Sequence, residues 1–99
     1  MICIKVHDSY RRVVAVSDVK IIGKKFFEGK RQLDVRENFY RGTEFSEEEA
    51  VKQLERHSLE DATFNIVGEK SVKAAMEANI IDKSCTATVS GVPFALKLI

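Results

Sequence analysis

The hydrophobic pattern of this chain changes its period along the sequence, and this change restricts the fold more than any single motif does. Residues 2–7 and 13–18 are rich in β-branched residues, and residues 4–7 alternate apolar with charged or polar side chains, which predicts two β-strands. Residues 46–57 and 69–78 instead carry apolar side chains at helical spacing. A chain that contains both periods is expected to combine strands and helices.

Both predicted helices have end signals. Ser46 can act as an N-cap, and Glu49 three residues later completes a capping box. The acidic residues 47–49 lie at the positive end of the helix dipole and stabilise it, so this acidic run has a structural explanation. After the second helix, Asn79 falls where a left-handed C-terminal cap is expected.

The expected architecture is a single α+β domain over residues 1–99, with a small, mostly antiparallel sheet of four to six strands packed with two helices. Residues 38–42 contain two aromatic side chains and are expected to form a loop anchored at the core margin. A tight turn at residues 91–93 is expected to join the last two strands. Besides the first two, the predicted strands are residues 31–36, 62–67, 85–90 and 94–98.

With 99 residues, 44% of them hydrophobic and 31% charged, the chain is large enough for one core and too apolar for a disordered chain. No apolar run approaches the ~20 residues of a transmembrane helix. The N-terminus lacks the basic and apolar regions of a signal peptide, so a cytoplasmic location is expected. Cys3 and Cys85 lie in apolar alternating segments and are expected to be buried free thiols.

The stretch N-I-V-G-E-K-S at residues 65–71 has the outline of a nucleotide-binding loop. Aligned with the P-loop pattern, however, Phe64 takes the place of the first glycine and Glu69 that of the second, so the pattern fails. A lone glycine also excludes the dinucleotide-binding fingerprint. What remains is either a sharp strand-to-helix turn or a weak anion site at the start of a helix. The residues of that anion site are Gly68, Lys70 and Ser71.

No metal, cofactor or catalytic site is expected. The chain has no pair of cysteines or histidines at ligand spacing. Cys3 and His7 are four residues apart on a strand, which separates their Cα atoms by about 13 Å, too far for one zinc ion. His57 lies at the end of a predicted helix, where a histidine commonly complements the dipole.

Charge is distributed unevenly, although the net charge is only +1. Residues 1–43 carry ten Lys and Arg against five acids, while residues 44–61 carry seven acids against two basic residues. The segment K-K-F-F at residues 24–27 interleaves charge with aromatic rings, a combination that binds a phosphate backbone and stacks a base. Adjacent phenylalanines on a strand point to opposite faces, so at least one belongs to the core. The first hypothesis is a non-enzymatic module that docks on RNA or a ribonucleoprotein through Arg11, Arg12, Lys24, Lys25, Lys30 and Arg31.

Two alternatives remain open. The basic surface can instead pair with the acidic segment 44–61, within the chain or in a second copy, which gives a protein–protein or self-association module. The turn at residues 65–71 can be a small-anion binder or an enzyme site. RNA docking predicts steeply salt-dependent affinity, self-association predicts a concentration-dependent mass, and the anion site predicts thermal stabilisation by phosphate-bearing ligands.

The opening M-I-C-I-K-V-H, the middle N-I-V-G-E-K-S-V-K-A-A-M-E-A-N-I-I-D and the closing S-G-V-P-F-A together resemble a small archaeal family catalogued as a domain of unknown function. The likeness spans nearly the whole chain and implies a single-domain, archaeal, cytoplasmic protein without an assigned activity. The family's closing motif runs G-V-P-H-A-Q, so Phe94 and Leu96 replace a histidine and a glutamine here, and Asn79 replaces a glycine. Either the histidine and glutamine have a catalytic or binding role in the family that this chain has lost, or these positions have a structural role.

Overall fold

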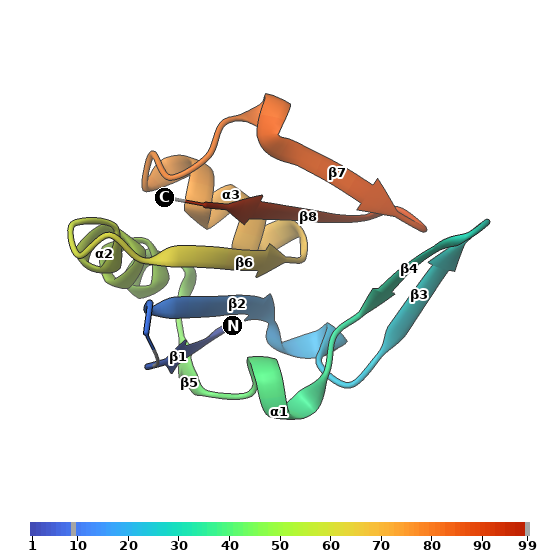
Figure 1. Ribbon diagram of the computed structural model, residues 1–99, viewed down its shortest axis with the longest axis horizontal. Helices are drawn as coiled ribbons and strands as arrows, with labels where there is room; N and C mark the ends of the chain where they lie inside the picture. Colours follow the sequence, from blue (N-terminus) through green and yellow to red (C-terminus); the bar gives the residue numbers. More distant parts are fainter. Residues whose placement is uncertain (9, 99) are drawn as a thin grey trace.

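The computed structural model describes residues 1–8 and 10–98 and has the predicted α+β fold (Figure 1). A six-stranded sheet forms its centre, and two further strands form a separate hairpin. The helices are α1 (Glu37–Tyr40), α2 (Glu47–Ser58) and α3 (Glu69–Glu77), with 3₁₀ turns η1 (Val19–Ile21) and η2 (Lys83–Cys85). The strands are β1 (Ile2–His7), β2 (Val13–Asp18), β3 (Lys25–Glu28), β4 (Arg31–Asp34), β5 (Thr43–Phe45), β6 (Thr63–Val67), β7 (Thr86–Val89) and β8 (Val92–Lys97).

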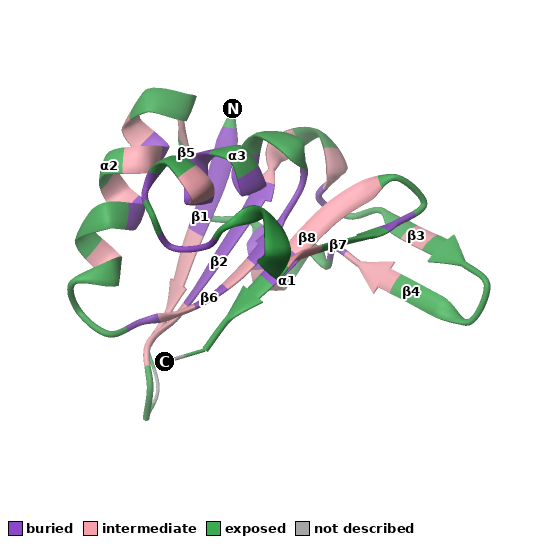
Figure 2. Ribbon diagram, turned by 90° about the horizontal axis from the view of Figure 1, so that it is seen from above, coloured by how far each residue is buried: buried purple, intermediate pink, exposed green. Residues whose placement is uncertain are grey.

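The strand order of the large sheet is β5-β1-β2-β6-β8-β7. All neighbours are antiparallel except the central pair β2 and β6, which is parallel. Helices α2 and α3 cover one face of this sheet, and the buried parts of β1, β2 and β6 lie beneath them (Figure 2). The main core joins these helices to the sheet through Ile2, Ile4, Val14, Val16, Phe64, Ile66, Ala50, Leu54, Val72 and Ala75.

A second apolar cluster lies on the opposite face of the sheet. There α1, η1 and the β3–β4 hairpin cover part of the strands, and Tyr40, Phe26 and Leu33 pack against the buried Cys3 and Val67. The two faces of β1 therefore carry the alternating residue sets that the sequence predicts.

The predicted helix ends are also found. Ser46 Oγ accepts a hydrogen bond from the Glu49 backbone N–H at 3.2 Å, which caps α2. Asn79 has φ 60°, its N–H donates to Met76 O at 3.0 Å, and the Ile80 N–H donates to Ala75 O at 3.0 Å. This pair of bonds is the Schellman motif, so Asn79 is the left-handed cap of α3. Among the described residues, no helix is long and apolar enough to span a membrane.

Several details differ from the sequence prediction, including the bounds of the later strands. Residues 37–40 form the helical turn α1 within the expected loop, although Tyr40 is buried as expected. The edge strand β5 was not predicted, because three residues are too few to show an alternating pattern. The last hairpin turns at Ser90 and Gly91, both with positive φ as a type I′ turn requires, so Pro93 lies inside β8 rather than in the turn.

The two cysteines have different surroundings. Cys3 is fully buried, and its Sγ accepts a hydrogen bond from the Gly42 N–H at 3.1 Å. Cys85 is exposed, so the prediction that it is buried is wrong. The reason is that η2 occupies residues 83–85 and β7 begins only at Thr86, which takes Cys85 out of the alternating strand.

Candidate functional site

The six basic residues of the RNA hypothesis fall into two groups in space. Arg11 and Arg12 lie just before β2, at the end of the sheet nearest the last turn of α2. The other four lie in or next to the β3–β4 hairpin, which follows the opposite end of β2 (Figure 1). A six-residue strand is about 20 Å long, so the two groups do not form one surface.

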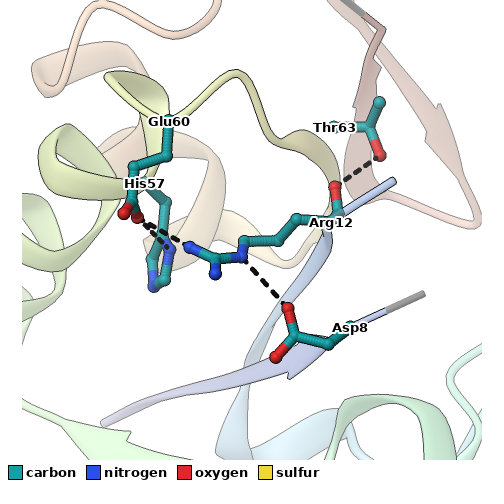
Figure 3. A network of polar contacts seen from close by, with 5 residues as sticks. All are labelled: Asp8, Arg12, His57, Glu60 and Thr63. Carbon is teal, nitrogen blue, oxygen red and sulfur yellow. Dashed lines mark hydrogen bonds and ion pairs between the residues drawn. The ribbon is translucent and has the colours of Figure 1, made fainter. Parts of the chain in front are cut away.

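Arg12 belongs to a network of charges within the chain (Figure 3). Its Nη1 lies 2.7 Å from Glu60 Oε1, and its Nε lies 3.2 Å from Asp8 Oδ1. The Arg12 carbonyl accepts a hydrogen bond from the Thr63 N–H at 3.0 Å. Arg12 thus holds the β1–β2 connection against the end of α2, in part by pairing with the acidic segment.

His57 borders the same network. Its Nδ1 is buried and lies 3.7 Å from Glu60 Oε1, too far for a hydrogen bond, and no other group among the described residues bonds to it. Burial lowers the pKa of His57 below its usual 6.5, and the positive charge of Arg12 lowers it further.

This lowered pKa predicts a loss of stability in mild acid. Between the usual value of 6.5 and the lower native pKa, the unfolded chain binds a proton at His57 that the folded chain does not. The free energy of unfolding is therefore expected to fall as pH decreases from 7.5 to 5.5. Urea unfolding at several pH values measures this, and the His57→Gln variant should show a flatter dependence. An equal slope in both proteins would rule out His57 as the cause.

The β3–β4 hairpin is a well-anchored element. At its root, Gly23 N–H donates to Val35 O at 2.6 Å and Val35 N–H donates to Lys24 O at 2.9 Å. Its inner face inserts Phe26 and Leu33, which oppose each other across the ladder, into the second apolar cluster. Near its tip, Glu28 Oε1 accepts a hydrogen bond from the Ser90 N–H at 2.7 Å. The hairpin therefore projects from the sheet as a fixed arm (Figure 2).

The outer face of this arm carries an exposed aromatic ring. Phe27 points away from the core because it alternates with Phe26, and 60% of its surface is exposed. Gln32 is its direct partner across the ladder, and Lys25 lies two residues before it on the same face. Within the described part of the chain, no ion pair involves the four cations of the arm, all of them exposed: Lys24, Lys25, Lys30 and Arg31.

A cleft of about 290 Å³ adjoins the hairpin. It opens between η1, the start of α3 and the β7–β8 turn, and its basic side chains are Lys20 and Lys70. The hairpin root follows directly from η1, and the tip is bonded to Ser90 beside the cleft residue Gly91. The predicted anion-site segment and most of the predicted RNA-binding residues thus lie at the same end of the sheet.

At the start of α3, the donors predicted for an anion are held by a carboxylate of the chain itself. Asp18 accepts hydrogen bonds from Lys70 N–H at 3.2 Å, Ser71 N–H at 2.8 Å and Ser71 Oγ at 2.7 Å. The Lys70 amine lies 4.0 Å from Glu47 Oε2. An external anion would have to compete with Asp18. The sequence gives no local signal for this cap, because the parallel pairing of β2 with β6 brings Asp18 there from more than fifty residues away.

Gly68 and Pro93 connect the segment 65–71 to the start of strand β8 beside the cleft. Gly68 has φ 106°, and a Cβ at this position would lie 2.4 Å from Asp18 Cγ. Its N–H donates to Pro93 O at 2.8 Å, while its own carbonyl accepts the first α3 bond from Val72 N–H at 2.9 Å. Both motif residues therefore have structural roles in this chain.

The positions of the replaced histidine and glutamine lie on the sheet face of the second cluster. Phe94 packs against this cluster and pairs with Val67, while Leu96 lies two residues further and is 54% exposed. In this chain Phe94 has a packing role. Among the described residues, no group of three or more His, Cys, Asp and Glu side chains is arranged to hold a metal ion.

Two comparisons place this fold among known proteins. The crystal structure of an uncharacterized conserved protein from Methanopyrus kandleri is similar with a TM-score of 0.87 and 21% sequence identity, over 96% of this chain and 88% of that chain. At this identity the likeness shows a shared fold. No curated protein matches the sequence. The model of the family described as "Protein of unknown function (DUF424)" matches residues 7–98. Because this match covers nearly the whole chain, the protein belongs to the DUF424 family.

Proposed function

We propose that the protein is a non-enzymatic module that docks on RNA or a ribonucleoprotein through the β3–β4 hairpin. The observation that carries this proposal is the arm itself, which combines four exposed cations with an exposed phenylalanine on a fixed support. Clustered cations attract a phosphate backbone, and an aromatic ring offers a stacking surface. The neighbouring cleft carries Lys20 and Lys70 together with Asp18 and Glu69, so the positive charge of the proposed contact belongs to the arm.

One of the two acidic residues of strands β3 and β4 is already engaged within the chain. Glu28 is engaged by the Ser90 N–H, which fixes its carboxylate at the β7–β8 turn. Asp34 lies opposite Lys25 in the ladder and is the acidic residue of the outer face. At the other end of the sheet, by contrast, Arg12 is bonded to two carboxylates. The hairpin therefore replaces the combined six-residue surface as the proposed contact.

We also propose that the protein acts in the cytoplasm of an archaeal cell. The free thiols Cys3 and Cys85 suit a reducing compartment, and the similar protein from Methanopyrus kandleri supports the archaeal origin.

Fluorescence anisotropy of labelled ribosomal and transfer RNA fragments tests the docking proposal. Micromolar or tighter binding at low salt, weakening steeply toward physiological salt, is the expected result. Absence of binding at low salt, where electrostatic attraction is greatest, would refute it. In that case the molar mass measured over a range of protein concentrations would test self-association, the alternative use of the charged surfaces.

A further inference from the structure

We infer that the outer face of the β3–β4 hairpin binds an unpaired stretch of RNA, with one base stacked on Phe27. This inference rests on the proposed function and specifies the class of RNA. It starts from the ladder of the hairpin, in which directly paired residues share a face. Phe26 and Leu33 form the inner pair, so Phe27 and Gln32 form an outer pair that faces away from the second apolar cluster.

The exposed ring of Phe27 distinguishes single-stranded from duplex RNA. In an A-form duplex the bases are stacked on each other and the major groove is too narrow for side chains, so a phenylalanine on a protein arm cannot stack on a base there. An unpaired base can be displaced from its neighbours and laid on the ring. A protein that recognised only duplex phosphates would need the cations of the arm and would have no use for Phe27.

The neighbours of Phe27 supply the other contacts that a nucleotide needs. Lys25 lies about 7 Å along the same face, counted between Cα atoms, and can reach a phosphate. The Gln32 amide, across the ladder from Phe27, can both donate to and accept from a base edge. Asp34 shares this face opposite Lys25 and partly offsets its charge. Phosphates on the two sides of the stacked base are expected to contact Lys25 on one side and Lys30 at the tip on the other.

Contacts within the chain hold the outer face of the hairpin in position without RNA. The root hydrogen bonds, the buried inner face and the bond between Glu28 and Ser90 hold the arm in place. A fixed stacking surface loses little conformational freedom on binding, which favours contact with a flexible single strand.

The absence of tryptophan in the chain gives a direct test. In the Phe27→Trp variant, binding of a twelve-nucleotide single-stranded RNA is expected to quench the indole fluorescence. The matched control is Leu59→Trp, which places the indole at an 87% exposed position at the other end of the sheet. That variant should show no quenching. The same oligonucleotide annealed to its complement should quench neither variant.

Affinity provides the second readout. The Phe27→Leu variant keeps an apolar side chain of similar size without a ring, and it is expected to bind single-stranded RNA on the order of tenfold more weakly with an unchanged salt dependence. Unchanged affinity together with an unquenched indole at position 27 would overturn the inference, even where salt-dependent RNA binding supports the docking proposal. If the unmodified protein binds no RNA at low salt, both proposals fail.

Discussion

Charge reversal of the hairpin root, by Lys24→Glu and Lys25→Glu together, is expected to weaken RNA binding on the order of a hundredfold or more at low salt. Each lysine that neutralises a phosphate contributes about one unit to the slope of log affinity against log salt, and each glutamate adds repulsion. Both the affinity and the slope should therefore fall. Both side chains are exposed, so the variant is expected to fold normally.

A variant with the same change in net charge separates local contact from general repulsion. Lys52 on α2 and Lys97 near the end of β8 are exposed and lie away from the hairpin. Glutamate at these two positions is expected to lower affinity by a few-fold at most, through long-range charge that salt screens. Equal losses in the two double variants would contradict a specific role for the hairpin. Circular dichroism of both variants would verify that the fold is intact.

Replacement of Gly68 by alanine is expected to destabilise the protein by about 3 kcal/mol, which corresponds to a decrease in melting temperature of roughly 12–24 °C for a domain of this size. Part of this loss is the cost of a non-glycine residue at φ 106°, about 1–3 kcal/mol. The remainder comes from the new methyl group, because it would lie 2.4 Å from Asp18 Cγ and displace the carboxylate that caps α3. Loss of a cap costs about 0.5–2 kcal/mol.

Three further variants divide this effect into its parts. Gly23 has a comparable φ of 91°, but a Cβ there would meet no atom within 4 Å, so Gly23→Ala measures the backbone cost alone. In the Asp18→Ala background, Gly68→Ala should cost little more than Gly23→Ala does, because the clash has been removed. Urea unfolding of the four proteins and the double variant gives these differences. Similar losses for Gly23→Ala and Gly68→Ala in the normal background would refute the proposed clash.

Elements with a strong local pattern could be predicted from the sequence. Strands β1 and β2 have the predicted bounds because each is rich in β-branched residues and a polar turn separates them, and α2 begins after Ser46 because the capping box is a local signal. Short elements such as α1 and β5 lacked enough residues to show a period. The parallel pairing of β2 with β6 depends on contacts between distant segments, and the sequence prediction did not contain it.

In the candidate site, too, local features could be predicted and contacts between distant segments could not. The alternation of Phe26 and Phe27 predicted that at least one ring would be buried, and Phe26 is the one that packs in the second cluster. The grouping of six basic residues could not be tested without the positions of the hairpin and of the β1–β2 connection. The contact between Asp18 and Ser71 could not be predicted either, because it depends on the tertiary fold.

Pro93 affects the transition from strand β6 to helix α3. In an antiparallel pair that exchanges two bonds, Gly68 would receive a hydrogen bond from the N–H of residue 93 in return for the one it donates. Proline has no N–H, so the Gly68 carbonyl stays available for Val72. The imino acid in β8 therefore leaves the ladder between β6 and β8 one hydrogen bond short at the residue where β6 ends and helix α3 begins.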